Sequence, residues 1–348
     1  MNVSAWAATA ANQPLAPFQL TRREVGPRDV QLEILYSGIC HSDIHQARGE
    51  WGNSKFPMVP GHEILGRVLK VGAEVKKFKV GDLAGVGCMV DSCRTCSSCG
   101  IGEEQFCDQQ PAWTYNSTEM DRVTPTYGGY STHVVVTEHF ALKVPASLNL
   151  QTAAPLLCAG ITTYSPLRQW NCKPGDKVAV MGLGGLGHMA VKLAAAMGAE
   201  VTVLSSSKSK EADAKRLGAA DFASSTEKGS LKRLKNRFNL IIDCVSADHD
   251  FDQYLGTLAP FGALVLVGAP PQPSRVSSFS LINNNRRLAG SSIGGIKQTQ
   301  EMLDFCAEKK VGADVELIAA KDINVAYERM LKNDVRYRFV IDAKTFAP

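Results

Sequence analysis

The stretch "GLGGLG" at residues 182–187 is the sequence feature that most constrains the fold. Its glycines match G-x-G-x-x-G, which alone is a weak signal. Here an apolar strand, "KVAVM", precedes it, a helical run, "HMAVKLAAAMG", follows, and a second strand, "EVTVL", comes next. In that context Gly182 permits a tight turn, Gly184 lets the backbone approach a pyrophosphate, and Gly187 lets helix and strand pack closely. The stretch therefore predicts a dinucleotide-binding βαβ unit; the alternative is an ordinary glycine-rich turn.

The end of the second strand bears on which dinucleotide binds. An NAD site normally has an acidic residue there, which accepts a hydrogen bond from the ribose 2′-OH. This chain reads "LSSSKSK", with Ser205, Ser206 and Lys210. Hydroxyl donors and a cation suit a 2′-phosphate, so we predict NADP(H). The alternative is that these are solvated turn residues and that another group selects the cofactor.

Strand and helix patterns divide the chain into two parts. Up to about residue 150 it shows short strands separated by glycine and proline, at 29–38, 65–72, 79–87 and two within 128–145. Beyond residue 175, apolar runs at 238–245 and 262–268 suit buried parallel strands, with helical patterns between them. From about residue 293 the pattern is helical and ends in a strand at 335–342. We predict a β-rich domain and a doubly wound α/β domain, which suits a chain of 348 residues.

The charge balance argues against some partners. Lys and Arg number 38 against 34 Asp and Glu, which is too even to indicate nucleic acid or a membrane surface. We interpret the most basic stretch, 231–238, as the solvated face of a helix; the alternative is a patch that binds a phosphate backbone. The N-terminal region has no signal-peptide pattern, and no apolar run is long enough to span a membrane. We therefore expect a cytoplasmic protein.

Four cysteines lie close together at Cys93, Cys96, Cys99 and Cys107, in a segment with few apolar residues. In a reducing compartment such a cluster indicates metal rather than disulfides. Four thiolates at this spacing can surround one tetrahedral zinc ion, which orders a loop that lacks a core of its own. We predict a structural zinc lobe over 88–108. An iron–sulfur cluster and four unrelated surface thiols are the alternatives, and Cys88 is interpreted as a buried small side chain.

A second metal site is predicted from residues far apart in the sequence. "GICHSDIH" contains Cys40, "VPGHEILG" contains His62, and Cys158 lies where the β-rich part gives way to the βαβ part. A single histidine is more often a satisfied polar residue than a ligand. Together, Cys, His and Cys form a three-ligand zinc site with one open position, the catalytic pattern. A site between two domains is also where a substrate would meet a cofactor.

With these motifs in place, the chain resembles the zinc-dependent medium-chain alcohol dehydrogenases, and within them the cinnamyl alcohol dehydrogenase branch with its bacterial NADP-dependent aldehyde reductases. The resemblance runs in order through "GICHSDIH", "PGHEILGRV", the four-cysteine lobe, "GGYS", "APLLCAGITTYSPL", "GLGGLGHMAVKLA", "GSSIGGIKQTQEMLDFC" and "YRFVID". It implies a GroES-like catalytic domain over 1–158 and 293–348 and a Rossmann cofactor domain over 159–292. It also implies a homodimer formed through the edge of the cofactor-domain sheet.

The resemblance also implies residue roles. Cys40, His62 and Cys158 would bind the catalytic zinc, with Glu63 beside it, and the four clustered cysteines would bind the structural zinc. Asp43 would accept a hydrogen bond from His62, Ser42 would touch the reacting oxygen, and His45 would pass the proton onward through the nicotinamide ribose. The implied cofactor contacts are Gly182, Leu183, Gly184, Gly185, Leu186, Gly187, Ser205, Ser206, Lys210, Cys244, Gly268, Ser291, Ser292 and Ile293. Two positions depart from the branch: Cys244, where plant members tend to have threonine, and Ser42, which is often threonine.

The expected activity is the reversible reduction of aldehydes to primary alcohols, with zinc as Lewis acid and NADPH as hydride donor. Trp51, Trp113 and Tyr115 are candidate walls of a pocket for an aromatic or other apolar aldehyde, or ordinary core aromatics. Two other classes are weighed. A quinone or enone reductase would lack the Cys–His–Cys set, and a nonenzymatic NADPH- and zinc-binding protein would not need an open coordination position.

Overall fold

The computed structural model describes residues 1–270 and 272–346, and it divides into two compact units. Unit 1 comprises residues 1–158 and the chain from Gly294 onward, and unit 2 comprises Ala159–Ile293. Among the described helices, none is long and apolar enough to cross a bilayer.

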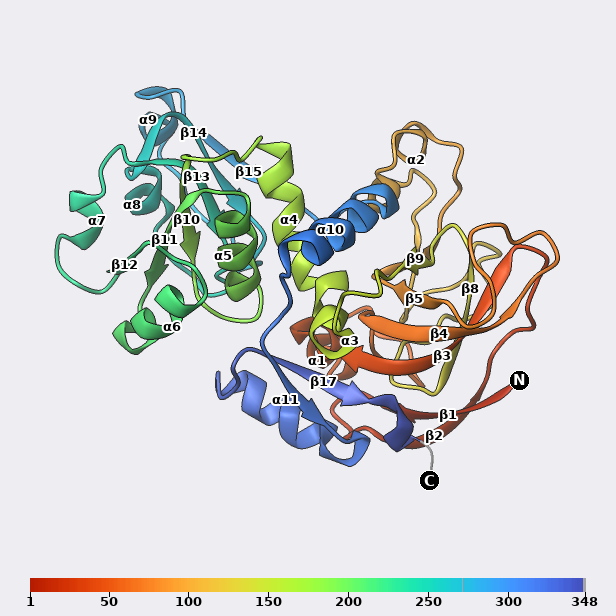
Figure 1. Ribbon diagram of the computed structural model, residues 1–348. Helices are drawn as coiled ribbons and strands as arrows, with labels where there is room; N and C mark the ends of the chain where they lie inside the picture. The colour runs from red at the N-terminus through yellow and green to blue at the C-terminus, as the bar shows by residue number, and fades with distance from the viewer. Residues whose placement is uncertain (271, 347–348) are drawn as a thin grey trace. The chain divides into compact units, whose positions relative to one another are not determined.

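Unit 1 is built on a mainly antiparallel sheet of seven strands, in the order β16-β17-β3-β4-β5-β9, with β8 paired to β3 (Figure 1). In its long strand β3, buried side chains alternate with more exposed ones from Val30 to Ile34, because one face covers the core, where Val30 and Leu32 are fully buried. The strands are β1 (Asn2–Ala7), β2 (Ala16–Thr21), β3 (Asp29–Gly38), β4 (Ile64–Val71), β5 (Leu83–Val86), β6 (Met89–Asp91), β7 (Ala112–Trp113), β8 (His133–Thr137), β9 (Leu142–Lys143), β16 (Val315–Ile318) and β17 (Arg338–Asp342).

Short helices join these strands and carry several of the predicted site residues. The helices are α1 (His41–Ala47), α2 (Ser97–Gly100), α3 (Leu150–Ala153), α10 (Ile296–Lys309) and α11 (Ile323–Leu331), with 3-10 turns η1 (Glu104–Phe106), η2 (Ala154–Leu157), η4 (Ala320–Asp322) and η5 (Ala343–Phe346). Asn149 starts α3, since its side chain accepts hydrogen bonds from two backbone N–H groups of the first turn.

Unit 2 is a doubly wound sheet of six parallel strands in the order β12-β11-β10-β13-β14-β15. The strands are β10 (Lys177–Met181), β11 (Glu200–Ser205), β12 (Asp221–Ser224), β13 (Phe238–Asp243), β14 (Leu258–Leu266) and β15 (Arg287–Gly290). The helices are α4 (Ala159–Gln169), α5 (Gly187–Ala196), α6 (Glu211–Arg216), α7 (Ser230–Arg233), α8 (Phe251–Leu255) and α9 (Ser278–Ile282), with the 3-10 turn η3 (Lys208–Lys210). The strand order reverses at β10, which is where such sheets bind ligands.

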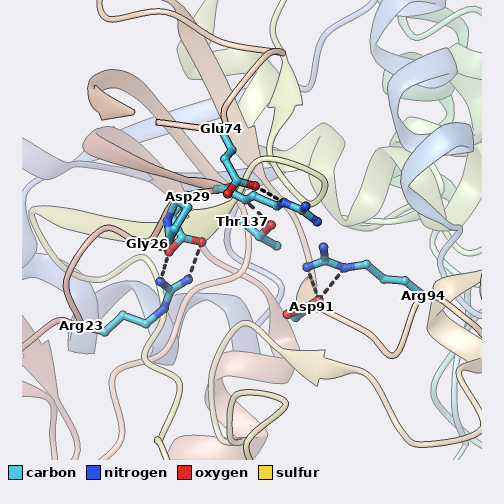
Figure 2. Close-up of a pocket in the computed structure, with 9 residues that line it drawn as sticks. Arg23, Gly26, Asp29, Glu74, Asp91, Arg94 and Thr137 are labelled. Carbon is cyan, nitrogen blue, oxygen red and sulfur yellow. Dashed lines mark hydrogen bonds and ion pairs between the residues drawn. The ribbon is translucent and has the colours of Figure 1, made fainter. Parts of the chain in front are cut away.

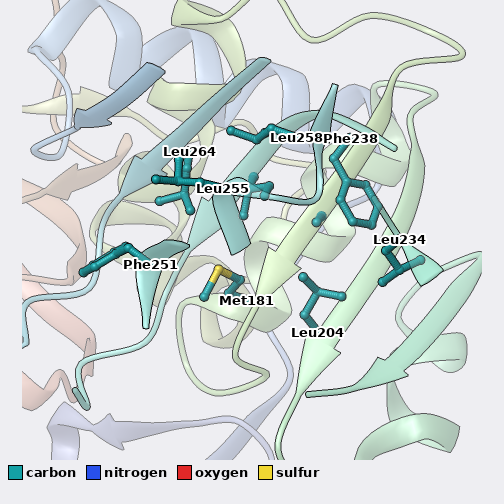
Figure 3. Close-up of a cluster of buried hydrophobic side chains, with 10 residues drawn as sticks. Met181, Leu204, Leu234, Phe238, Phe251, Leu255, Leu258 and Leu264 are labelled. Carbon is teal, nitrogen blue, oxygen red and sulfur yellow. The ribbon is translucent and has the colours of Figure 1, made fainter. Parts of the chain in front are cut away.

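Figure 3 shows the apolar cluster that holds unit 2 together. Phe238 and Ile241 from β13 meet Leu255 from α8, and all three side chains are fully buried. Burying one such side chain contributes roughly 1.5–3 kcal/mol. The predicted helix at 231–238 is wrong in its length: α7 ends at Arg233, because Leu231 and Leu234 pack on this cluster and the chain turns there into β13.

Candidate active site

Four ligand atoms from three separate segments of unit 1 converge at the predicted catalytic metal site. One atom each from Cys40, His62, Glu63 and Cys158 lies within 4.8 Å of the others. Cys40 is the N-cap of α1, His62 and Glu63 come directly before β4, and Cys158 follows η2. The two Sγ atoms are 3.9 Å apart. Two thiolates on one tetrahedral zinc, each at about 2.3 Å, lie roughly 3.8 Å apart, so the residues present fit the ion.

The groups of this set perturb one another strongly and in opposite directions. The hydrogen bond with Cys40 raises the pKa of the Cys158 thiol well above its usual range. The hydrogen bond with Cys158 is the main cause that lowers the pKa of the Cys40 thiol well below its usual range, although burial acts against it. Burial raises the pKa of Glu63 to about 7, although the Arg338 guanidinium beside it acts in the opposite direction. Arg338 donates to Glu63 Oε1, while the buried Oε2 has no hydrogen-bond partner among the described residues. A buried oxygen without a partner is costly, and a metal ligand bond would satisfy it.

His62 is held on two sides. Its Nδ1 lies 3.4 Å from Asp43 Oδ1, and its ring stacks parallel on Tyr115, with 5.7 Å between the ring centroids. Asp43 also accepts from the backbone N–H of Cys40 at 2.9 Å, which closes the first turn of α1. An acceptor on Nδ1 fixes the tautomer that leaves Nε2 free for a metal.

The predicted proton-relay residues lie along α1. The Oγ atom of Ser42 is 3.7 Å from Cys40 Sγ, and His45 follows one helical turn later. The Nδ1 atom of His45 lies 2.5 Å from Glu50 Oε2, and its ring stacks on Trp51 with centroids 5.3 Å apart. Ser42 thus lies beside the predicted metal ligands, and one turn further along α1 His45 contacts the exposed Glu50.

The four clustered cysteines also converge, with their Sγ atoms all within 4.8 Å of one another. The Sγ atoms of Cys93 and Cys99 are 3.9 Å apart, again the spacing of a tetrahedral site. Backbone N–H donors of Thr95 and Cys96 lower the pKa of Cys93 to about 6, which favours the thiolate that a metal needs. Two alternatives, an iron–sulfur cluster and four unrelated thiols, were open from spacing alone; the geometry removes the second.

The lobe is tied to the rest of unit 1 through Glu104. This buried carboxylate accepts from the backbone N–H of Ile296 at 2.9 Å and lies 3.2 Å from His139 Nε2. Ile296 is the first residue of α10, so Glu104 satisfies a donor at the start of a 14-residue helix.

In unit 2 the glycine loop has the conformation that the fingerprint requires. Gly182 has φ of +80°, which an L side chain rarely adopts. A Cβ at Gly187 would lie 1.9 Å from the carbonyl oxygen of Gly182, so only glycine allows this close packing. A Cβ at Gly184 would meet nothing within 4 Å. The open space beside Gly184 is where a pyrophosphate would approach the backbone.

The remaining predicted cofactor residues lie at the same edge of the sheet, because each follows the carboxyl end of a parallel strand. Ser205 ends β11, and Lys210 reaches back so that its Nζ donates to the carbonyl of Leu183 in the glycine loop at 2.8 Å. Ser206 is exposed. The loops after β13, β14 and β15 bring in Cys244, Gly268, Ser291, Ser292 and Ile293.

The three aromatic residues predicted to line a pocket differ in how far their side chains are exposed. Trp51 and Trp113 are 53% and 38% exposed, so their rings are available to a ligand. Tyr115 is 7% exposed and covers His62, which makes it part of the support of the metal site.

The hollow in Figure 2, about 430 Å³, contains none of the predicted site residues. Its three arginines each pair with a carboxylate: Arg23 with Asp29, Arg28 with Glu74, and Arg94 with Asp91. The hollow therefore offers no unpaired guanidinium for an anion.

Sequence reasoning missed several residues of the site. Tyr130 and Arg338 lie within the stretches "GGYS" and "YRFVID", but neither stretch indicates a role for them, and Glu50 lies in no motif. The fold alone sets their partners. Cys88, interpreted as a packed small side chain, has its Sγ 3.9 Å from the carbonyl of Leu157 and interacts with the thiol of Cys158. It is thus a neighbour of the metal set, although it is outside the four converging ligands.

A GroES-like β domain with two cysteine-based metal sites, followed by a Rossmann unit with an open glycine loop, defines the class of zinc- and dinucleotide-dependent dehydrogenases. Comparison with known proteins agrees. The family described as zinc-binding dehydrogenase matches residues 185–308, and the alcohol dehydrogenase GroES-like domain matches residues 26–146. The chain belongs to the zinc-binding alcohol dehydrogenase family, which confirms the resemblance and the fold class predicted from sequence.

Individual relatives cover nearly the whole chain. It is 56% identical to NADP-dependent alcohol dehydrogenase C 1 of Mycolicibacterium smegmatis, over 98% of this chain and 97% of the relative. It is 51% identical to aldehyde reductase YahK of Escherichia coli, over 99% of both chains. The structure of a cinnamyl alcohol dehydrogenase from Sorghum bicolor superposes with a TM-score of 0.96 at 46% identity, covering 99% of this chain and 98% of the other. A Helicobacter pylori enzyme solved with NADP(H) gives a TM-score of 0.91 at 43% identity, covering 99% and 98%.

Proposed function

We propose that this protein catalyses the reversible, NADP(H)-dependent reduction of aldehydes to primary alcohols at a zinc site. The observation that carries the proposal is the convergence of Cys40, His62 and Cys158 within 4.8 Å, with Glu63 beside them. Two cysteines and one histidine are three firm ligands of a tetrahedral zinc, so a fourth position is available to the substrate oxygen or, in its absence, to Glu63 Oε2. The relatives named as NADP-dependent alcohol dehydrogenase and aldehyde reductase support this activity.

In this proposal each metal has its own residues. Cys40, His62 and Cys158 hold the catalytic zinc, and Cys93, Cys96, Cys99 and Cys107 hold the structural one. When bound, the catalytic zinc supplies Lewis acidity and NADP(H) supplies or accepts the hydride. Asp43 keeps His62 in the tautomer that can bind.

The chain itself moves the proton. We propose that Ser42 contacts the reacting oxygen and that His45 passes the proton outward in alcohol oxidation and inward in aldehyde reduction. In the outward direction, Glu50, 2.5 Å from His45, accepts the proton and returns it to solvent. The α1 helix fixes the spacing of Ser42 and His45, so the path needs no large movement.

Cofactor selection falls to the end of β11. We propose that Ser205, Ser206 and Lys210 bind the 2′-phosphate of NADP(H), and that the 182–187 loop, Cys244, Gly268 and residues 291–293 bind the rest. Lys210, already directed at the loop carbonyl of Leu183, needs only a side-chain shift to reach a phosphate. Trp51 and Trp113 are proposed to line a pocket for aromatic or other apolar aldehydes.

The domain boundaries and the assembly are also part of the proposal. Residues 1–158 with 293–348 would act as the catalytic domain and 159–292 as the cofactor domain, in a cytoplasmic homodimer. Support for the dimer lies at the open edge strand β15 and at Phe261, which is exposed on the neighbouring strand β14.

One comparison of substitutions tests the cofactor assignment. Ser206→Asp should weaken NADPH binding by about 10- to 150-fold, since a carboxylate repels the phosphate and a charge-assisted contact is worth roughly 1.5–3 kcal/mol. NADH should bind equally well or better, because the carboxylate can accept from a free 2′-OH. Ser209→Asp, a nearby exposed serine on η3, is the matched control. Equal wild-type kcat/KM for NADH and NADPH would refute the assignment.

The enzyme class is tested by metal content together with NADPH consumption on benzaldehyde. Two zinc ions per chain and turnover support the proposal. Turnover with a quinone but no catalytic zinc would favour a quinone reductase, and two zinc ions without turnover on a panel of aldehydes would favour a nonenzymatic binding protein.

A further inference from the structure

A series of buried hydroxyl groups ends on the carboxylate of Asp43. Asp43 is fully buried, and its Oδ2 accepts from the phenol of Tyr130 at 3.1 Å as well as from the backbone of Cys40. Its Oδ1 accepts from the backbone N–H of Gly61 at 3.1 Å and faces His62. These donors, with the phenol of Tyr115 nearby, fix the carboxylate plane and with it the acceptor presented to His62.

The series continues beyond Tyr130. The phenol of Tyr327, on α11, donates to the phenol oxygen of Tyr130 at 3.5 Å, although 197 residues separate them. Both rings are buried, at 0% and 3% exposure. Burial raises the pKa of both phenols well above the usual value, so both remain protonated and act as donors.

We propose that Tyr130 and Tyr327 are positioning residues for the catalytic metal site, acting through Asp43 on His62. The inference rests on the proposed function, because it presumes that His62 binds zinc. Tyr130 orients the carboxylate directly. Tyr327 orients only Tyr130, since its hydroxyl reaches no other partner among the described residues.

The order of contacts predicts the order of effects. Without the Tyr130 hydroxyl, the carboxylate loses one donor on Oδ2 and keeps the N–H groups of Cys40 and Gly61 and the nearby phenol of Tyr115. The carboxylate can then rotate relative to the ring of His62. Outer-shell partners of metal-binding histidines are typically worth about 10- to 100-fold in metal affinity. Removal of the Tyr327 hydroxyl leaves Tyr130 in place but less directed, so a smaller loss follows. Once the Tyr130 hydroxyl is absent, removal of the Tyr327 hydroxyl should have no further effect on zinc release, because Tyr327 contacts Asp43 only through Tyr130.

The test uses the full-length zinc protein and four variants: Tyr130→Phe, Tyr327→Phe, the double variant, and Tyr36→Phe as control. Tyr36 lies on β3 in the same unit, and its hydroxyl contacts Gln151 rather than the metal site. The first readout is the rate of zinc transfer to pyridine-2,6-dicarboxylate, with the four-cysteine lobe as an internal slow reference. The second is the visible absorption of the cobalt(II) form, which reports ligand orientation and needs no turnover. Thermal unfolding of each apo variant monitors the fold.

We expect Tyr130→Phe to release one zinc about 10- to 100-fold faster and to shift the cobalt bands. Tyr327→Phe should accelerate release by about two- to fivefold, and the double variant should match Tyr130→Phe within about twofold, as coupled residues do. Tyr36→Phe should match the wild type. A wild-type rate of zinc release and a wild-type spectrum in Tyr130→Phe would overturn the proposal that the two tyrosines act on His62 through Asp43. Multiplicative effects in the double variant would overturn it as well. In both cases aldehyde reduction by the wild type would still support the proposed function. A wild-type chain with zinc only in the four-cysteine lobe would overturn the proposed function and this inference together.

Discussion

A substitution of His45 can distinguish proton transfer from zinc binding. His45 is absent from the converging ligands, and its Nδ1 faces Glu50 instead. We expect His45→Ala to retain both zinc ions and to slow alcohol oxidation about 10- to 100-fold near neutral pH, the modest effect of one lost acid–base group. Steady-state kinetics with metal analysis checks this. Gln19→Ala, on the distant β2, serves as control, and metal loss from His45→Ala would contradict the assignment.

A second single-residue prediction concerns His249 in unit 2. Its Nε2 lies 2.9 Å from the buried carboxylate of Asp243 and its Nδ1 lies 2.8 Å from the carbonyl of Ala247, so both ring nitrogens face acceptors. The hydrogen bond to Asp243 is the main cause that raises the pKa of His249. Asp248 adds to it, and the rings of Phe251 and Tyr254 pack around the imidazole.

The sign of the pH dependence follows from that raised pKa. The protonated ring stabilises the fold fully below about pH 6.5, the usual pKa of histidine, and this contribution is lost as the pH rises through the higher folded-state pKa. We expect the free energy of unfolding of the wild type to exceed that of His249→Gln by on the order of 1 kcal/mol at pH 6 and by less at pH 9. Urea unfolding at both pH values measures this. A difference that grows with pH would show that the imidazole is neutral in the folded protein.

At the scale of elements, the β10–α5 turn offers a matched pair of glycines. A Cβ at Gly187 would lie 1.9 Å from a backbone oxygen, so Gly187→Ala should lower stability by about 1–3 kcal/mol or more. A Cβ at Gly184 meets no protein atom within 4 Å, so Gly184→Ala should fold normally. It should nevertheless weaken NADPH by about tenfold or more, because the methyl group occupies the approach of the pyrophosphate.

Melting temperature and NADPH fluorescence titration together separate the two effects. Wild-type affinity in Gly184→Ala would show that the pyrophosphate binds elsewhere. Wild-type melting in Gly187→Ala would show that helix and strand can move apart there at little cost.

The predicted elements differ in how well their patterns identified them. The strand at 29–38 is β3, and the two strands predicted within 128–145 are β8 and β9. The alternation of β3 and the apolar runs of β10 and β13 are strong local signals. The β1–β2 hairpin gave no such signal, since β2 is mostly exposed. The helix predicted at 231–238 was too long, because packing of Leu234 on the unit 2 core overrode its charged pattern.

At the scale of the whole molecule, we expect two zinc ions per chain with separable roles. Cys107→Ser should lose one zinc and much of the stability of unit 1, since a closed four-thiolate site contributes folding free energy and the lobe also carries Glu104, which caps α10. Cys158→Ser should lose the other zinc and the activity while the fold survives. Elemental analysis, activity and thermal unfolding of both variants check this. One metal per wild-type chain, or identical consequences of the two substitutions, would contradict it.

The sequence by itself determined the features whose residues are neighbours along the chain. The glycine loop between β10 and α5, the four cysteines within 15 residues and the serines after β11 are such features, because turn geometry and ligand spacing act over short stretches. It also supplied Cys40, His62 and Cys158 as candidates.

Only the tertiary structure brought Cys40 to within 3.9 Å of Cys158, across 118 residues, and Arg338 onto Glu63 across 275. The same holds for the series from Tyr327 through Tyr130 to Asp43. Such contacts leave no periodic pattern in the sequence. They form because each polar group buried by the packing of the core needs a hydrogen-bond partner, and that partner can come from any segment brought close by the fold.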